Sequence, residues 1–444
     1  MDPKTPWPIC VRTALLALAL ITCPTGAIAA DVEQAFEVWL VDQSNSPGKT
    51  YGGTIFIYDG TDISGHSASN AAPSATIDLG GDTAALCLAQ TGVNPVRPHM
   101  VFFNTAQSHA VLAFVASGHV VFFNAASRAP VACLRTSPGA GGARQAHAAF
   151  PTPDDTMVLV ANQNGKLVER IATNYAAESF VHEPAATLNL ATCTTPNGFA
   201  CQDPVLRPDN APICPFVPSD NGFAFISLRG GGLFVLDHRS TPMAIVGEYT
   251  TSQIGGNGCG FAEAKGRVIM NAGGATAANL DEFAAFRLPM TGYSPANPPE
   301  TPARELLFKD DSTHRDAHGT VATKGERYVW IFDRAGNVAE VFDGVSGARI
   351  NTVNLVSDGS FDPTPDLGVL SPDGSRLFFS LRGPVPLSGD PHASTGTTPG
   401  LGVIQVTAGG SDGFVKAIVR ISNTDAGGVE RADAHGIALR RVQR

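Results

Sequence analysis

The chain has few charged residues and few tryptophans, and its apolar runs are short. Asp, Glu, Lys and Arg make up 16% of the 444 residues, Trp occurs three times, and the net charge is −10. An acidic chain whose charges are evenly mixed disfavours nucleic acid and anionic membranes as partners. No apolar run reaches the ~20 residues that a transmembrane helix needs. We therefore expect no membrane span.

Several catalytic motifs are also missing. The sequence contains no Ser-His-Asp order typical of serine hydrolases and no C-x-x-C. Its glycine-rich segments, such as "LRGGGL" and "NAGGATAANL", are not followed by a helical pattern, so they do not predict a phosphate-binding loop. These absences argue against a serine hydrolase, a zinc ribbon and a nucleotide-binding protein.

The first 30 residues have the features of a signal peptide. Lys4 and Arg12 precede a short apolar core, "ALLALALI", and "AIA" at 27–29 is a typical cleavage signal. An alternative is a lipoprotein signal at Cys23, which the preceding Thr22 disfavours. We predict a mature chain that begins at Ala30 or Asp31, lies in the periplasm or is secreted, and has a net charge of about −11, because residues 1–29 remove two positive charges and one negative charge.

Six cysteines follow the predicted cleavage site, and an even number in an exported chain predicts disulfide bonds. They are Cys87, Cys133, Cys193, Cys201, Cys214 and Cys259. Cys193 and Cys201 bracket the turn-rich segment "TTPNGFA" and are the pair that we predict first. Six cysteines allow fifteen pairings, so the rest of the connectivity stays open.

Short β-rich runs between turn signals predict an all-β fold. In residues 315–357, four such runs follow one another within roughly 40 residues, as in one blade of a β-propeller. Applied to the whole chain, this unit predicts a single seven-bladed domain over 31–444. The predicted blades are 433–441 with 36–80, 97–136, 144–191, 210–249, 257–308, 315–357 and 364–421.

The tetrapeptide "DAHG" occurs at 316–319 and again at 433–436, eight residues before the end of the sequence. After the first copy the blade continues as "YVWIFDRAGNVAEVFDG". A matching pair of strands, "EVWLVDQ" and "GGTIFIYDG", follows the predicted signal peptide instead. We therefore expect the C-terminal strand to complete the N-terminal blade and so to pair sheet edges that would otherwise be exposed.

Two segments resemble the YVTN-type repeat of the seven-bladed propeller superfamily. "TPDDTMVLVANQNGKL" and "SPDGSRLFFSLRG" place S/T-P-D before an apolar strand, as that repeat does. The resemblance extends over most of the predicted mature chain and implies the fold, but it says little about chemistry.

Alignment of the blades on their turns brings one position per blade to the central channel. The residues at this position are His435, His99, His147, Cys214, Cys259, His318 and Asp366. Asp316 and Asp433 precede two of the histidines by two residues. Since side chains alternate along a strand, we expect these two carboxylates to orient the imidazoles. Cys214 and Cys259 lie on adjacent blades, where a disulfide is favoured over two thiolate ligands.

Converging imidazoles predict a copper or zinc ion on the propeller axis, with His99, His147, His318 and His435 as ligands and Asp366 as a fifth. The arrangement resembles in outline the exported copper enzymes related to nitrous oxide reductase, although paired histidines are absent. The alternative is that the histidines bind water and neighbouring carbonyl groups and only rigidify the ring.

The leading functional hypothesis is a copper-dependent oxidoreductase that acts on a small molecule. The alternatives are a zinc or copper metallochaperone that passes its ion to an acceptor protein, and a protein-binding scaffold. A propeller lactonase would need Glu263 or Glu282 beside an axial histidine. The remaining histidines are expected in strands (His109, His119), in solvated turns (His66, His182, His238, His392) or near the channel mouth (His314).

Overall fold

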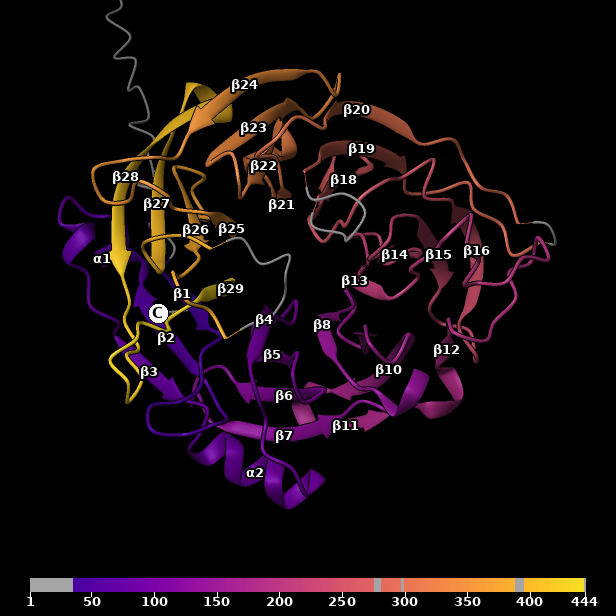
Figure 1. Ribbon diagram of the computed structural model, residues 1–444, viewed down its shortest axis with the longest axis horizontal. Coiled ribbons are helices and arrows are strands. Elements are labelled where there is room, and N and C mark those ends of the chain that lie inside the picture. The colour runs from indigo at the N-terminus through magenta and orange to yellow at the C-terminus, as the bar shows by residue number, and fades with distance from the viewer. Residues whose placement is uncertain (1–34, 275–280, 297–298, 388–394, 443–444) are drawn as a thin grey trace, which may run out of the picture. The chain divides into compact units, whose positions relative to one another are not determined.

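The computed structural model describes residues 35–274, 281–296, 299–387 and 395–442. The predicted signal peptide, Cys23 and His392 lie outside these residues. The described part is a seven-bladed β-propeller, with seven sheets of at least four strands each arranged around a central channel (Figure 1). One sheet has a short fifth strand. The predicted fold class is confirmed, and each predicted blade corresponds to one sheet.

In each blade the first strand faces the channel and the others follow outward. Blade one consists of β29 (Ala434–Arg441), β1 (Phe36–Asp42), β2 (Thr54–Asp59) and β3 (Ala75–Asp78). Blade two consists of β4 (Pro98–Phe103), β5 (His109–Phe114), β6 (His119–Asn124) and β7 (Pro130–Arg135). Blade three consists of β8 (Ala146–Pro151), β9 (Met157–Asn162), β10 (Leu167–Asn174) and β11 (Ser179–His182), with β12 (Leu188–Asn189) also paired to β10.

The other four blades follow in chain order. Blade four consists of β13 (Pro212–Phe216), β14 (Ala224–Leu228), β15 (Leu233–Asp237) and β16 (Ala244–Tyr249). Blade five consists of β17 (Phe261–Ala264), β18 (Arg267–Gly273), β19 (Phe283–Pro289) and β20 (Glu305–Asp310). Blade six consists of β21 (Ala317–Ala322), β22 (Tyr328–Asp333), β23 (Val338–Asp343) and β24 (Arg349–Asn354). Blade seven consists of β25 (Pro365–Leu370), β26 (Arg376–Leu381), β27 (Gly400–Thr407) and β28 (Asp412–Arg420).

Two α-helices were not predicted from the sequence. They are α1 (Gly60–Ser64) and α2 (Asp82–Thr91). Helix α2 ends at Gly92, which adopts a left-handed conformation as helix C-caps commonly do. The helix joins blade one to blade two and is fixed to β7 by the Cys87–Cys133 disulfide. Among the described residues, no helix has the length and apolar character that crossing a bilayer requires.

The ring closes between the two ends of the domain, as predicted. Strand β29 pairs antiparallel with β1, in a register that sets Phe36 opposite Arg441 and Leu40 opposite Ile437. Buried side chains of blades seven and one then share one apolar cluster, to which Val38, Phe378 and Ile437 belong. The C-terminal strand is therefore an internal part of the fold.

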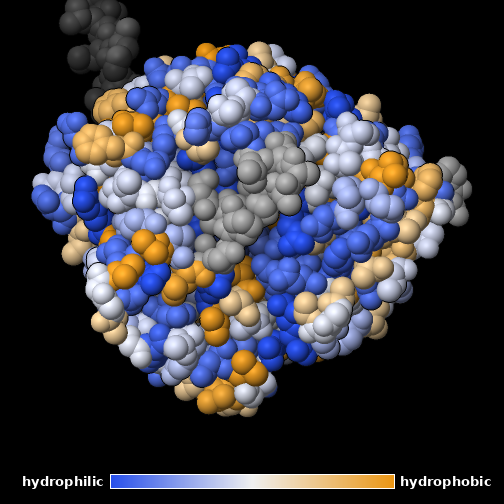
Figure 2. Space-filling model, in the orientation of Figure 1, coloured by the Kyte–Doolittle hydropathy of each residue, from blue (hydrophilic) through white to orange (hydrophobic). Residues whose placement is uncertain are grey.

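The core lies between neighbouring blades, where the strand faces are apolar. Fully buried aromatic residues such as Trp39, Trp330 and Phe234 fill the space between adjacent sheets. On the face drawn in Figure 2, hydrophobic residues are scattered among hydrophilic ones. Each blade thus buries both faces of its sheet against its two neighbours, as propeller blades do.

Candidate functional site

The residues of the predicted ring lie at an irregularity that recurs around the channel. In six blades the pairing between the first and second strands shifts by one residue around the ring position, for example between Pro98 and Val101 and between Ala317 and Thr320. In blade five, Cys259 lies just before β17. The pair Asn257–Gly273 before it and the pair Phe261–Met270 after it differ in register by the same one residue. Such β-bulges redirect a side chain and are frequent beside functional sites. Here they coincide with the seven ring residues.

The glycine after the ring residue explains why "DAHG" is repeated. A Cβ atom at Gly319 would collide with the carbonyl oxygen of Asp366 in the next blade. A Cβ atom at Gly436 would collide in the same way with the carbonyl oxygen of His99. Glycine therefore allows adjacent inner strands to approach closely enough to narrow the channel.

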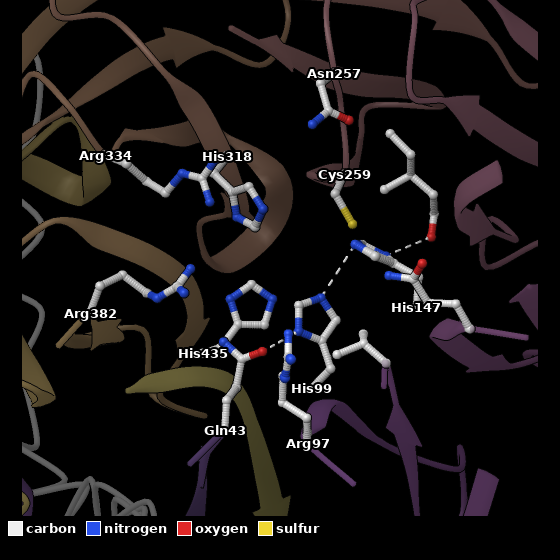
Figure 3. Close-up of a pocket in the computed structure, with 13 residues that line it drawn as sticks. Gln43, Arg97, His99, His147, Asn257, Cys259, His318, Arg334, Arg382 and His435 are labelled. Carbon is white, nitrogen blue, oxygen red and sulfur yellow. Dashed lines mark hydrogen bonds between the residues drawn. The ribbon is translucent and has the colours of Figure 1, made fainter. Parts of the chain in front are cut away.

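Four imidazoles line one pocket at the centre of the ring, with their rings turned toward one another (Figure 3). They belong to His99, His147, His318 and His435. The rings of His99 and His435 are stacked, with centroids 3.9 Å apart, and the His99 and His147 rings meet edge to face at 4.6 Å. The four histidines that the sequence assigns to one site are thus neighbours in space.

The Nδ1 atoms of His99 and His147 are both held by acceptors in the wall of the pocket. Nδ1 of His99 lies 2.7 Å from Oε1 of Gln43, and Nδ1 of His147 lies 3.0 Å from the carbonyl oxygen of Ile213. The amide orientation of Gln43 is fixed because its Nε2 donates to Asp433 at 3.3 Å. Each imidazole therefore carries its proton on Nδ1 when neutral.

As a result, two nitrogen lone pairs point at each other. Nε2 of His99 and Nε2 of His147 are 3.3 Å apart. Two neutral imidazoles that donate through Nδ1 have no proton to share across this gap. Burial, with the nearby His435 and His147, lowers the pKa of His99 well below 6.5, so the His99 imidazole is neutral at pH 7. The two Nε2 atoms are close enough to each other to contact one cation at the same time.

Asp366 holds the other two imidazoles. Its Oδ1 lies 2.6 Å from Nδ1 of His318, and its Oδ2 is hydrogen-bonded to Nδ1 of His435. The Nε2 atom of His435 is buried without a hydrogen-bond partner. Burial lowers the pKa of His435 to about 4, so this imidazole is neutral at pH 7. All four Nδ1 atoms thus lie beside an acceptor oxygen at the edge of the pocket.

Arginines form the layer behind the histidines. Arg382 donates to Asp366 at 2.9 Å and binds both oxygens of Asp433, at 2.7 and 2.9 Å. Burial alone would raise the pKa of Asp366, but His435, His318 and Arg382 outweigh burial and hold that pKa well below 3.8. Asp366 is therefore a carboxylate under all ordinary conditions.

The contacts of Asp316 and Asp433 differ from the sequence-based expectation. Asp433 binds Arg382, and Asp316 binds Arg334 at 2.8 Å, instead of orienting the imidazole two residues later. Asp366 contacts two Nδ1 atoms, and its role as a metal ligand stays a prediction. The prediction assumed regular alternation along the inner strand, and the bulge that begins beside each of these residues breaks that alternation.

The arginines and the glutamine behind the ring histidines were not predicted from the sequence. For the arginines, however, the sequence contains a recurring pattern. Arg229, Arg334 and Arg382 each follow the second strand of a blade, in "ISLRG", "IFDRA" and "FSLRG". Each of the three binds an aspartate, namely Asp209, Asp316 and Asp433, respectively. For Gln43, which follows β1, we find no comparable pattern.

The pocket is small and polar. Its volume is about 70 Å³, and its wall includes Arg97, Gln145, Asn257 and Cys259 besides the histidines. A water molecule needs on the order of 10–15 Å³ of such space. The pocket therefore has room for an ion with a few water molecules or with one very small ligand.

All six predicted disulfide cysteines are paired in the structure. The bonds are Cys87–Cys133, Cys193–Cys201 and Cys214–Cys259. The last joins the inner strand of blade four to the start of blade five, as expected, and Cys259 lies in the wall of the pocket. Its sulfur atom points toward the ring of His147 in Figure 3.

Among the described residues, the histidines outside the ring do not line this pocket. His66 and His314 are exposed, and His109 and His119 begin strands β5 and β6, as expected. His182 ends strand β11, and His238 is buried, so neither is the solvated turn residue that was predicted. The lactonase candidates Glu263 and Glu282 do not line the pocket either. Glu263 accepts a hydrogen bond from the backbone N–H of Ser219.

Comparisons with known proteins support the fold alone. No protein-family model and no curated protein sequence matches the chain. Among solved structures, a hypothetical selenium-binding protein from Sulfolobus tokodaii matches with a TM-score of 0.59 and 8% identity, over 91% of this chain and 93% of that protein. The periplasmic gluconolactonase of Pseudomonas aeruginosa matches with a TM-score of 0.54 and 12% identity, over 91% and 100% of the two chains.

A third similar structure is a putative 6-phosphogluconolactonase from Bacteroides fragilis, with a TM-score of 0.54 and 9% identity over 92% of this chain and 99% of that one. Identities this low establish a shared propeller architecture and no shared chemistry. The predicted likeness to YVTN-type proteins is thus supported only as a seven-bladed fold, and the likeness to nitrous oxide reductase stays a prediction.

Proposed function

We propose that the four ring histidines bind one transition-metal ion and that the protein is a metal-dependent enzyme acting on a small molecule. The observation that carries this proposal is the 3.3 Å separation of Nε2 of His99 from Nε2 of His147. Two nitrogen ligands at 2.0–2.1 Å from a tetrahedral ion lie about 3.3 Å apart. His435 and His318 would complete the ligand set.

The surroundings of the four imidazoles match those of metal-binding histidines. Such histidines usually donate their second ring N–H to a carboxylate, a carbonyl or an amide oxygen, which fixes the tautomer. Here the acceptors are Gln43, Ile213 and Asp366. In the alternative, the imidazoles only bind water and rigidify the ring. That role does not require every Nδ1 atom to lie beside an acceptor.

We propose copper as the ion, with zinc as the competing occupant. Imidazole suits both metals, and copper forms the more stable complexes with a given set of nitrogen ligands. A bound copper ion would supply one-electron redox chemistry and would polarise a bound oxygen or nitrogen atom. The chain itself would position the substrate, through the polar side chains of Arg97, Gln145 and Asn257 in the pocket wall.

We also propose that the protein is exported. The three disulfides are typical of proteins from oxidising compartments, and the N-terminal 30 residues have the pattern of a signal peptide. Mass spectrometry of protein isolated from the producing cell should show a chain that begins at Ala30 or Asp31. An intact N-terminus, or a lipid on Cys23, would contradict this proposal.

Metal analysis of the purified protein tests the site. We expect one copper ion per chain. Replacement of His99, His147, His318 or His435 by alanine should each lower the affinity at least roughly 10-fold, because one of four ligands is lost. His66→Ala is the matched control, since His66 is exposed and distant from the pocket. A parent protein without stoichiometric metal, or His variants that bind as tightly as the control, would refute the site.

Turnover separates the enzyme from the two alternatives. A metallochaperone would release its copper to an apo acceptor protein without converting a substrate, and a scaffold would do neither. The small volume of the pocket favours an enzyme, because it leaves space beside the ion for a very small substrate. A screen of small thiols, amines and inorganic nitrogen compounds for copper-dependent oxidation would provide the first test.

A further inference from the structure

A second group of metal-binding atoms lies beside the four histidines. Nitrogen of His147 and the sulfur atoms of Cys214 and Cys259 all lie within 4.8 Å of one another. The two sulfur atoms form a disulfide in the structure, so they are not ligands in this state. His147 is therefore shared between the proposed histidine site and this sulfur-containing group.

The neighbourhood of the disulfide is rich in soft donor atoms. Sδ of Met100 lies 4.0 Å from Sγ of Cys214. Met100, Ile213, Cys214 and Cys259 form one buried cluster around the channel. Thiolates and thioethers select copper(I), and imidazole completes such sites. The atoms needed for a copper(I) site are thus present, but two of them are joined to each other.

This disulfide borders two cavities. Cys259 lines the histidine pocket. It also lines a larger cavity of about 430 Å³, whose walls include Met100, Phe102, Phe150 and Phe261. The phenylalanines follow the ring position along the inner strands, so this cavity lies farther along the same channel.

We propose that reduction of the Cys214–Cys259 disulfide creates a copper(I) site made of these two thiolates and His147, with the Met100 thioether alongside. The proposal depends on the proposed histidine site in one respect only, because that site is the source of the ion. Because His147 serves both sites, reduction would move the ion from the imidazoles toward the sulfur atoms. The disulfide would then be a redox switch of metal occupancy.

Two classes of reductant, dithiols and phosphines, can convert the disulfide into two thiols. A dithiol donates two electrons and two protons, the S–S bond breaks, and the dithiol becomes a disulfide. A phosphine with water gives the same two thiols and a phosphine oxide. When copper(I) binds, the two thiols release two protons and ligate as thiolates. An ion that leaves the histidine site as copper(II) takes up one further electron, which a further half equivalent of the same reductant supplies.

The chain offers a matched control at another place. Cys87 and Cys133 also form a disulfide next to a histidine, His119, and their potential ligand atoms are equally close together. The ring nitrogens of His119, however, are both hydrogen-bonded, one to Thr91 at 2.8 Å and one to Ser117 at 2.9 Å. This second group does not line the histidine pocket. It provides two thiols after reduction at a place outside the histidine pocket.

The test is an anaerobic titration with copper(I) in the presence of a competing chromogenic chelator. The protein is compared before and after reduction by a phosphine that is then removed by gel filtration. We expect that only the reduced protein withdraws one equivalent of copper(I) from the chelator and shows thiolate-to-copper absorption in the near ultraviolet. The double variant C214S/C259S should lose both signals, and C87S/C133S should retain them.

If the serine variants fail to fold, His147→Ala provides the second test, because it leaves all the cysteines in place. Loss of the tight copper(I) binding in reduced His147→Ala supports the switch. Equal copper(I) affinity of oxidised and reduced parent protein overturns it, as does retention of the signals in C214S/C259S. An oxidised protein that binds no metal, together with a reduced one that does, would refute the histidine site and leave the switch standing.

Discussion

Arg382 and Asp433 form a buried two-point ion pair that joins blade seven to the C-terminal strand of blade one. The Nε–Oδ1 and Nη2–Oδ2 distances are 2.7 and 2.9 Å, and both side chains are almost completely inaccessible to solvent. The same guanidinium group also reaches Asp366, which contacts His435. One arginine thus connects the closure of the ring to the candidate metal site.

Replacement of Arg382 by methionine should be strongly destabilising. It would leave Asp433 and Asp366 buried without their cationic partner, and the loss of one member of a buried ion pair typically costs about 3–5 kcal/mol. Urea denaturation would measure the change in the free energy of unfolding. Arg327→Met is the control, because the Arg327–Asp343 pair is at the surface and should contribute little to the free energy of unfolding. Equal effects of the two changes would contradict the structural role of Arg382.

Removal of residues 433–444 should prevent cooperative folding. The deletion takes away β29 and exposes the backbone hydrogen-bonding groups of β1, which pairs with it along its length. We expect aggregation or a broad unfolding transition in calorimetry. A chain that ends at Val442 retains the whole of β29 and is the control. If the deleted protein unfolded as sharply as this control, β29 would not be needed for closure.

Asp366→Asn should lower the affinity for the metal ion more than it lowers the stability of the fold. The carboxylate contacts Nδ1 of both His318 and His435, and loss of such a partner typically lowers metal affinity 10- to 100-fold. Competition titration with a metal chelator would measure the effect. The exposed Asp358→Asn variant should match the parent protein. An unchanged affinity in Asp366→Asn would show that the carboxylate does not support the ligands.

His119 should make the protein less stable in mild acid. Burial lowers the pKa of this histidine to about 4, whereas the unfolded chain takes up the proton near pH 6.5. Between these two values the unfolded state binds more protons, so the free energy of unfolding falls as the pH falls, by at most about 1.4 kcal/mol per pH unit from this residue.

Urea midpoints measured between pH 7 and pH 4 would test the role of His119. His119→Asn cannot take up a proton and should show a shallower decline, whereas the exposed His66→Asn should follow the parent protein. Parallel curves for all three proteins would assign the acid sensitivity to other groups.

The sequence predicts the ring and its closure because both depend on local patterns. Two copies of "DAHG" mark equivalent strands, and in each copy the backbone N–H of the aspartate donates to another aspartate at the end of a β-strand, Asp333 or Asp42. A repeated tetrapeptide therefore corresponds to a repeated local structure. The same regularity identifies the seven ring positions.

What the sequence does not predict arises from departures from regularity. The partners of Asp316 and Asp433 depend on bulges, which change the direction of a side chain without leaving a distinctive composition. The support of His99 by Gln43 joins residues 56 positions apart in two different blades. Helix α2 has a weak amphipathic pattern, and its position follows from the disulfide that fixes it to β7.

The position of β29 has a consequence for the order in which the molecule is assembled. Synthesis produces β1 first and its inner neighbour last, so the pairing of Leu40 with Ile437 must wait for nearly the whole chain. Blades two to seven consist of strands that are contiguous in the sequence and can form as they emerge. Blade one alone must stay incomplete until the final strand arrives. The slowest contacts to form are therefore the ones that place His435 beside His99, and the candidate metal site can be assembled only after β29 has been synthesised.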